Sequence, residues 1–161
     1  MNPWLVLMFV GAGIVFLLDY IFRRKKWKHN TKAEKISITY SNISSTDLVY
    51  NTNTGCYTFY KNGYEKNDAI NGQTPTFKNC FVLFADSITY DNSLGTKLVM
   101  GTIGNGDGYY FTEGTMVKIK WSSDLEGNMS FTLTDGAPLV INRGRSYIAY
   151  IKTSATNNIL F

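Results

Sequence analysis

The residue types that most often carry enzyme chemistry are scarce in this chain of 161 residues. His29 is its single histidine, and it precedes the region where strand-like segments begin. A Ser-His-Asp triad or a Cys-His pair needs a histidine beside the nucleophile, and the usual zinc site needs four histidine or cysteine ligands. The sequence therefore excludes both chemistries downstream of His29, and it predicts no metal site and no cofactor.

Cys56 and Cys80 are the two cysteines, and both fall in segments of strand-like composition. Two cysteines permit one disulfide but do not require it. A location outside the cytoplasm would favour a Cys56–Cys80 disulfide, whereas a cytoplasmic location would leave both as small buried apolar side chains. The pairing therefore depends on the compartment and stays open.

A glycine-rich segment runs from Gly104 to Gly108 with the sequence GNGDG. A phosphate-binding loop would need a Lys-Ser/Thr pair after its last glycine, and none follows. A calcium loop would need several spaced carboxylates and a distal glutamate, but only Asn105 and Asp107 fit, and Glu113 comes too early. We therefore interpret the segment as a glycine-rich turn between two strands.

Two pairs of carboxylates could in principle perform acid–base chemistry. Asp107 with Glu113, or Asp124 with Glu126, would suit glycoside hydrolysis if the two groups faced one cleft about 5–10 Å apart. All four lie at or near predicted turns, where acidic side chains are usually solvated. A carboxylate-based hydrolase acting on glycans is therefore an alternative function rather than the leading one.

Aromatic and arginine side chains form the stronger binding candidate. Tyr109, Tyr110 and Trp121 lie around one predicted hairpin, and Arg143 and Arg145 lie in a later predicted turn. Exposed aromatic rings beside arginines suit contacts with sugars or peptides. The competing interpretation is that these rings belong to the core on one face and to its rim on the other.

Pro3 to Phe22 form one apolar run that is followed at once by Arg23-Arg24-Lys25-Lys26. A helix of about 20 apolar residues spans a hydrocarbon core of about 30 Å, so the run predicts a single transmembrane helix. A cleaved signal peptide would need a basic segment before a shorter apolar stretch and a small-residue cleavage site, and neither is present. The lipid bilayer is therefore the first predicted partner.

The net charge of +4 comes from the segment after this run. From Ile36 onward the chain has nine Lys and Arg against ten Asp and Glu, a balance of −1. A nearly neutral body lacks the basic surface of a nucleic-acid binder, so nucleic acid is not a predicted partner. The basic residues after the helix place the body in the cytoplasm by the positive-inside rule.

The rest of the chain has the composition of a β protein. Thr115–Trp121 alternates, with Val117, Ile119 and Trp121 on one face, whereas Phe77–Phe84 ends apolar on both faces, as in a strand covered on both sides. Turn signals separate the short strands, including Asn62-Gly63 and Glu113-Gly114. We expect an all-β fold, an antiparallel sandwich or small barrel. The predicted divisions are a transmembrane anchor (1–22), a basic juxtamembrane linker (23–43) and a β-rich domain (44–161).

Several segments in fixed order carry a resemblance over about residues 44–151. They are Tyr50 with Gly55-Cys56-Tyr57 and Asn62-Gly63, then Phe77–Phe84, Gly106–Gly114, Ile119–Trp121, and Asp135–Leu139 with Asn142–Ile148. Together they resemble the C-terminal domain of the YerB-like family, lipoproteins of Gram-positive bacteria with no established activity. The resemblance implies a location outside the cytoplasm and carries over no catalytic residues. Family members typically have a lipid-modified cysteine and an N-terminal domain first, and here an anchor leads into the second domain.

These observations predict a membrane-tethered, non-enzymatic β-domain that binds an envelope protein or glycan. The candidate binding residues are Tyr109, Tyr110, Trp121, Arg143 and Arg145. The alternatives are the carboxylate-based hydrolase and a purely structural fragment of a larger assembly. The side of the membrane stays open, because the resemblance favours the outside and the flanking charge favours the cytoplasm.

Overall fold

The computed structural model of the chain describes residues 31–92 and 95–161. The predicted transmembrane helix, Pro3–Phe22, and the basic run after it lie outside the described residues. Among the residues described, no helix is long and apolar enough to cross a membrane. The described body is all-β, as predicted, with two six-stranded sheets, one two-stranded hairpin and a short 3₁₀ segment, η1 (Thr153–Asn158).

The first sheet, sheet A, has the order β1-β11-β10-β7-β13, and β12 pairs with β11. Its strands are β1 (Thr31–Lys32), β7 (Asn79–Ala85), β10 (Gly104–Thr112), β11 (Thr115–Ser123), β12 (Met129–Leu133) and β13 (Ser146–Lys152). All pairs are antiparallel except β7 with β13, which is parallel. Sheet A is therefore mixed, a departure from the antiparallel arrangement that we expected. A long connection separates β7 from β13, which gives the chain room to return in the same direction.

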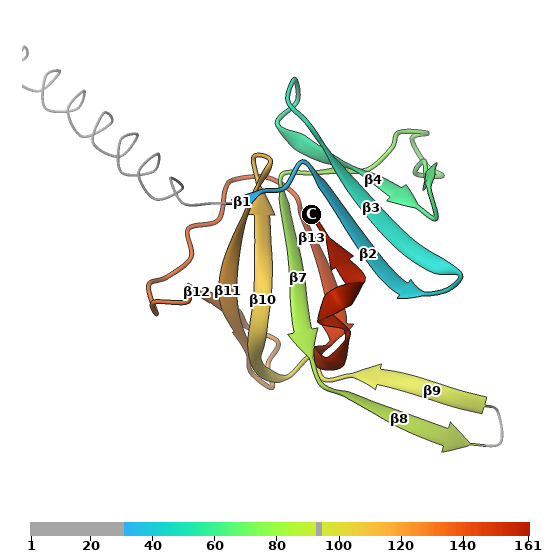
Figure 1. Cartoon of the computed structure of the whole chain (residues 1–161), viewed down its shortest axis with the longest axis vertical. Coiled ribbons are helices and arrows are strands. Elements are labelled where there is room, and N and C mark those ends of the chain that lie inside the picture. Colours follow the sequence, from blue (N-terminus) through green and yellow to red (C-terminus); the bar gives the residue numbers. More distant parts are fainter. Residues whose placement is uncertain (1–30, 93–94) are drawn as a thin grey trace, which may run out of the picture. The chain divides into compact units, whose positions relative to one another are not determined.

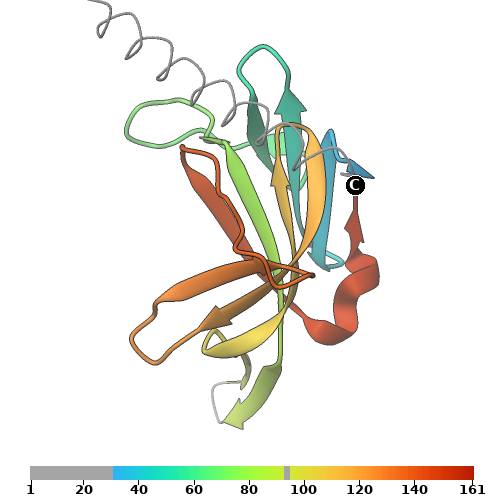
Figure 2. The same ribbon diagram turned by 90° about the vertical axis from the view of Figure 1, so that its left-hand side faces the viewer.

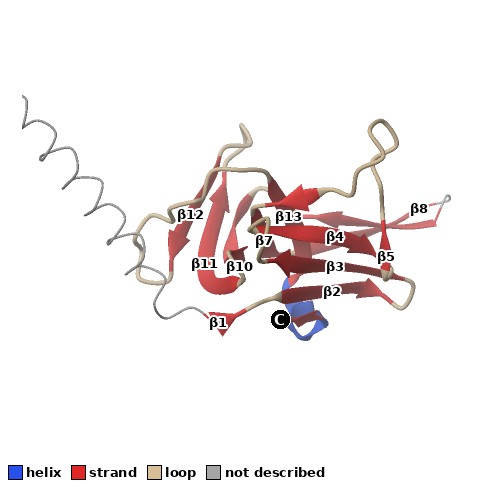
Figure 3. Cartoon of the chain, turned by 90° about the horizontal axis from the view of Figure 1, so that it is seen from above, coloured by secondary structure: helices blue, strands red, loops and turns tan. Residues whose placement is uncertain are grey.

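The second sheet, sheet B, has the order β14-β2-β3-β4-β5, and β6 pairs with β4. Its strands are β2 (Lys35–Ser41), β3 (Ser44–Asn51), β4 (Cys56–Lys61), β5 (Tyr64–Glu65), β6 (Thr76–Phe77) and β14 (Ile159–Leu160). Figure 3 shows β2, β3 and β4 side by side in one layer. The hairpin of β8 (Ser87–Asn92) and β9 (Gly95–Met100) projects from the two sheets (Figure 1).

The strands begin earlier in the chain than residue 44. Both β1 and β2 fall in the stretch 23–43 that we expected to be a linker. Ile36 and Ile38 alternate along β2 and are fully buried, so this strand is part of the body. The short alternation between polar residues had concealed the strand in the sequence.

The main core lies between the two sheets. Sheet B contributes Ile36, Ile38, Leu48 and Tyr57, and sheet A contributes Cys80, Val82, Phe84, Phe111, Met116, Ala149 and Ile151. The alternating pattern in β2 and β3 leaves the other face of sheet B polar, as expected for a sheet with one solvated face. This side of β7 is therefore covered by sheet B.

The opposite face of sheet A holds a second apolar layer. Phe81 stacks on Phe131 with ring centroids 4.6 Å apart, and Trp121 meets Tyr150 edge-on at 5.7 Å. These contacts require β12 to fold back over β7 and β13, and Figure 2 shows the orange strands crossing the green β7 at a steep angle. All seven residues of β7 are buried, which confirms the prediction of a strand covered on both sides.

Two predicted turns are confirmed by backbone geometry. Asn62 (φ 53°) and Gly63 (φ 80°) connect β4 to β5, and Glu113 (φ 51°) and Gly114 (φ 69°) connect β10 to β11. Positive φ at both central residues is the requirement of a type I′ hairpin. The side chain of Glu113 forms an ion pair with Lys78, at 3.2 Å between Oε1 and Nζ.

A buried polar network fixes the connection between β12 and β13 to sheet A. Tyr110 donates to Asn79 Oδ1 at 2.7 Å and accepts from the backbone N–H of Asn142 at 3.1 Å. Asn79 Nδ2 donates to the carbonyl of Asn142 at 2.8 Å. Burial raises the pKa of Tyr110, so its hydroxyl keeps the proton that it donates. The network therefore holds the connection over the second apolar layer.

We expect Tyr110→Phe to lower the free energy of unfolding by about 1–3 kcal/mol, because the buried Asn79 and the half-buried Asn142 each lose a hydrogen-bond partner. Urea denaturation of the full chain in detergent micelles measures the change. Tyr64→Phe is the matched control, since Tyr64 is exposed and should change the stability by less than about 0.5 kcal/mol. Equal stability of the two variants would contradict this account of the network.

Candidate functional site

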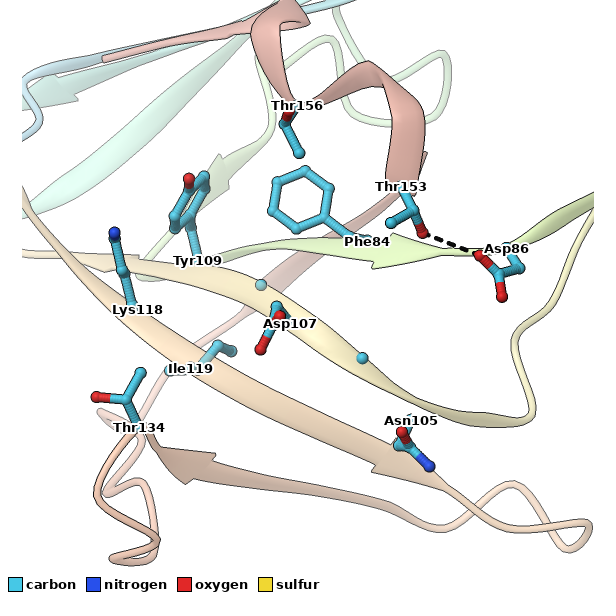
Figure 4. Close-up of a pocket in the computed structure, with 12 residues that line it drawn as sticks. Phe84, Asp86, Asn105, Asp107, Tyr109, Lys118, Ile119, Thr134, Thr153 and Thr156 are labelled. Carbon is cyan, nitrogen blue, oxygen red and sulfur yellow. Dashed lines mark hydrogen bonds between the residues drawn. The ribbon is translucent and has the colours of Figure 1, made fainter.

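A groove of about 520 Å³ opens beside the first half of β10. We call it the β10 groove, and Figure 4 shows its lining. The rings of Phe84 and Tyr109 and the side chain of Ile119 form its apolar part. Polar side chains surround them, namely those of Asp86, Asn105, Asp107, Lys118, Thr134, Thr153 and Thr156. The combination of ring surface with convergent polar groups is the usual composition of a ligand site.

Strand alternation places these side chains together. Asn105, Asp107 and Tyr109 occupy one face of β10, and the register sets Lys120 opposite Asp107 and Lys118 opposite Tyr109. Phe84 ends β7 beside them, and η1 contributes Thr153 and Thr156 from the far end of the chain. Tyr109 is half-buried because its ring packs against Phe84 (5.4 Å between centroids) and Phe161 (5.5 Å).

The glycines between these residues lie inside β10, so our prediction of a glycine-rich turn at Gly104–Gly108 was wrong. A Cβ on Gly106 would lie 2.5 Å from the carbonyl oxygen of Phe84 and 2.8 Å from Trp121 Nε1. A Cβ on Gly108 would lie 2.8 Å from the carbonyl oxygen of Val82. Glycine is needed here because neighbouring groups approach closely, not because the chain turns.

The acidic groups of the groove are held by neighbours. Asp107 pairs with Lys120 at 3.3 Å between Oδ1 and Nζ, and both side chains are largely exposed. Asp86 accepts a hydrogen bond from Thr153 Oγ1 at 3.1 Å, drawn as the dashed line in Figure 4. A second hollow of about 350 Å³ shares Asn105, Gly106 and Asp107 in its wall. Asp107 therefore stands at the boundary of two adjoining hollows.

The structure separates the five binding residues that we predicted. Tyr109 lines the β10 groove, but Tyr110 (0% exposed) and Trp121 (2% exposed) are core residues of the second apolar layer. Trp121 Nε1 donates to the carbonyl of Phe84 at 3.0 Å. Arg143 and Arg145 are exposed just before β13. The arginines lie beside Asn79, and Asn79 pairs with Thr112 at the end of β10. Thr112 is five positions after Asp107 on this strand, about 17 Å at about 3.4 Å per residue. The arginines are therefore far from the β10 groove.

The predicted carboxylate pairs do not face a common cleft. Glu113 comes six positions after Asp107 along the extended strand, about 20 Å away, which is well beyond the range for a glycosidase pair. Asp124 caps its own turn by accepting from the backbone N–H groups of Glu126 and Asn128. These hydrogen bonds, with that from the Asn128 side chain, hold the pKa of Asp124 below its usual value, so it is unsuited to be a general acid.

Sequence reasoning missed most of the groove. Asp86, Lys118 and the η1 residues Thr153 and Thr156 stand in three separate stretches of the chain and match no local motif. Only the alternation of Asn105, Asp107 and Tyr109 was a usable signal, and interpreting the segment as a turn hid it. Among residues 31–92 and 95–161, no group of three His, Cys, Asp or Glu side chains is arranged to hold a metal ion.

Two packed sheets define an all-β, sandwich-like domain, and the β10 groove is hollowed into its described surface. The chain belongs to the family described as "Protein of unknown function (DUF3048) C-terminal domain", whose model matches residues 36–148. This confirms the resemblance found in the sequence.

The chain is also similar to the crystal structure of the YerB protein from Bacillus subtilis, with a TM-score of 0.68 and 16% sequence identity. The match covers 81% of this chain and 44% of that chain, so this chain spans less than half of that protein. At this level of identity the likeness shows the fold. Comparison with curated proteins gives no match.

Both cysteines are free thiols in the structure, so the Cys56–Cys80 disulfide is not formed in it. Cys56 is half-buried at the start of β4, whereas Cys80 is fully buried in β7. Burial raises the pKa of the Cys80 thiol well above its usual range, and the thiol is unreactive in that form.

We expect one thiol of the folded full-length protein to react with a chromogenic disulfide reagent at pH 8, and two after unfolding in guanidinium chloride. The first is Cys56, so Cys56→Ser should abolish the reaction of the folded protein, whereas Cys80→Ser should leave it unchanged. If thiols appear only after reduction, Cys56 and Cys80 are bridged and this assignment is overturned.

Proposed function

We propose that the chain is a membrane-tethered, non-enzymatic domain that binds an envelope glycan in the β10 groove. The observation that carries the proposal is the lining of this groove. The half-buried ring of Tyr109, packed against the buried ring of Phe84, offers an apolar surface, and carboxylate, amide, hydroxyl and ammonium groups surround it. Sugars present the complementary pattern, with apolar C–H faces and a rim of hydroxyl groups.

The polar groups suit hydroxyl recognition. Asp86 and Asp107 accept hydrogen bonds, Lys118 donates them, and Asn105, Thr153 and Thr156 do both. Hydrogen bonds to charged groups are the stronger class, at about 1.5–3 kcal/mol each. A bound sugar would therefore gain most from Asp107, which is exposed and at the junction of the two hollows.

The tether rests on the apolar run Pro3–Phe22 and its basic flank. An envelope glycan requires the domain to lie outside the cytoplasm, which is also what membership of a YerB-like family suggests. The flanking charge opposes this orientation, although long domains translocate largely regardless of charge. We therefore propose a single-pass membrane protein with its β-domain on the outer side.

The hydrolase is the less favoured alternative. Its best remaining pair is Asp86 with Asp107, which line one groove. Asp86 already accepts a hydrogen bond from Thr153 and Asp107 is paired with Lys120, so both carboxylates are engaged within the chain and not with each other across the groove. A purely structural role as part of a larger assembly is the third alternative, and it predicts that no glycan binds.

We expect Asp107→Ala to weaken binding of insoluble peptidoglycan by about tenfold to a hundredfold, because a charged hydrogen bond is worth about 1.5–3 kcal/mol. Co-sedimentation of the full chain in detergent micelles measures the affinity. The matched control is Asp47→Ala, which removes the equivalent ion pair with Lys35 (3.4 Å) on sheet B. Equal losses in both variants, or no binding by the unaltered chain, would contradict the proposed site.

We expect the full chain to sediment with membranes and to be released by detergent but not by about 1 M salt, which screens purely electrostatic attachment. A variant without residues 3–22 should remain in the supernatant. If the full chain also remains in the supernatant without detergent, the proposed tether does not exist.

A further inference from the structure

Almost every edge of sheets A and B in the described body is short or covered. The strands β1, β5, β6 and β14 are two residues long each. The outer edge of β12 is bonded by the chain that follows it, through Leu133 N to Ala137 O at 2.8 Å and Leu139 N to Phe131 O at 3.0 Å. Short, covered or charged edges are the usual protection against unwanted strand pairing.

β13 is the exception. It is a seven-residue strand at the edge of sheet A, and it pairs with β7 on one side. Asn79 N donates to Arg145 O at 3.2 Å, which fixes the phase of the ladder. In a parallel pair alternate residues bond to the neighbour, so the backbone groups of Ser146, Ile148 and Tyr150 point away from β7.

These outward backbone groups are unpaired. Within residues 31–92 and 95–161, no hydrogen bond reaches the backbone N–H or C=O groups of Ser146, Ile148 or Tyr150. An edge of this kind is satisfied by another extended backbone, which can present N–H and C=O groups at the same spacing. Glycans and lipids cannot match this pattern along a strand.

The side chains along this edge indicate which residues a partner strand would carry. Tyr147 to Ile151 is uncharged, and Ile148 is 41% exposed beside the outward edge. Val140 and Ile141, on the connection leading to β13, are also exposed apolar residues. Arg143 and Arg145 mark one end of the strand, and no salt bridge within the described part of the chain includes either.

We infer that the outer edge of β13 binds an extended segment of another polypeptide as an added strand, with acidic residues at the end that meets Arg143 and Arg145. A second copy of this chain is the poorer occupant. In an antiparallel β13–β13 pair, the Arg145 end of one copy would meet the Lys152 end of the other, which places like charges together. This site is independent of the β10 groove and of the glycan proposed for it.

The test uses the full chain in detergent micelles and the fluorescent peptide Asp-Glu-Val-Thr-Val-Thr-Val-Glu-Asp. We expect saturable binding by fluorescence anisotropy. The same peptide with N-methyl groups on alternate residues, which cannot pair along one edge, should bind at least about tenfold more weakly. A version with lysines in place of its acidic residues should also bind more weakly, because it meets two arginines.

Ile148→Pro is the decisive variant. Its missing N–H points away from β7, so the proline spares the ladder that holds β13 in the sheet, as edge prolines do. We expect at least a tenfold loss of peptide binding with an unchanged melting temperature of the β-domain, whereas Ile148→Val should bind normally. The double variant Arg143→Gln with Arg145→Gln should bind the acidic peptide more weakly. Its affinity for a peptide with glutamines in place of the acidic residues should be unchanged.

Three outcomes would overturn the inference. They are absence of binding by the unaltered chain, equal binding of the N-methylated peptide, and normal binding by a folded Ile148→Pro variant. Concentration-dependent dimers that Ile148→Pro abolishes, with no peptide binding, would identify a second copy as the occupant instead. Peptidoglycan binding should be unchanged in Ile148→Pro, so failure of this site and failure of the β10 groove are distinguishable.

Discussion

Burial of β7 on both faces is the constraint that the rest of this fold satisfies. A single sheet packed on another covers only one face, so a second apolar layer must exist on the far side. The chain provides it by folding β12 back and fixing the following connection through Tyr110, Asn79 and Asn142. The buried network stabilises this cover because each polar group in it has a partner, and an unmatched group at this depth would cost more than the network contributes.

The same constraint shapes the β10 groove. The second apolar layer brings the indole of Trp121 against β10, and its N–H group reaches the backbone of Phe84. Any side chain at Gly106 would occupy that space. In the first half of β10, one face therefore carries glycines and the other carries Asn105, Asp107 and Tyr109. The close approach of β7, β10 and β11 at Gly106 therefore places the buried Trp121 on one face of β10 and the polar groove on the other.

The sequence predicted the elements better than it predicted the site. The apolar run in β7, the alternation in β11 and the Glu113-Gly114 hairpin are local patterns, and each was confirmed. The assignment of Tyr110 and Trp121 to a binding surface failed because a ring on a strand can face either layer, and only the register decides which. Asp86 follows β7 and Thr153 begins η1, so the two hydrogen-bonded residues are 67 positions apart in the chain. No local spacing in the sequence could therefore have indicated this contact. The parallel pairing of β13 left no local signal either.

That parallel pairing also has a consequence during synthesis. Each residue of β13 meets a partner in β7 that was translated 67 positions earlier, as with Ser146 and Asn79. Until Lys152 has left the ribosome, β7 has no strand paired along this edge, and sheet A is incomplete. Such long-range pairings slow folding and lengthen the exposure of aggregation-prone segments. In a growing chain this edge of β7 therefore stays open to pairing with other strands until β13 has been synthesised.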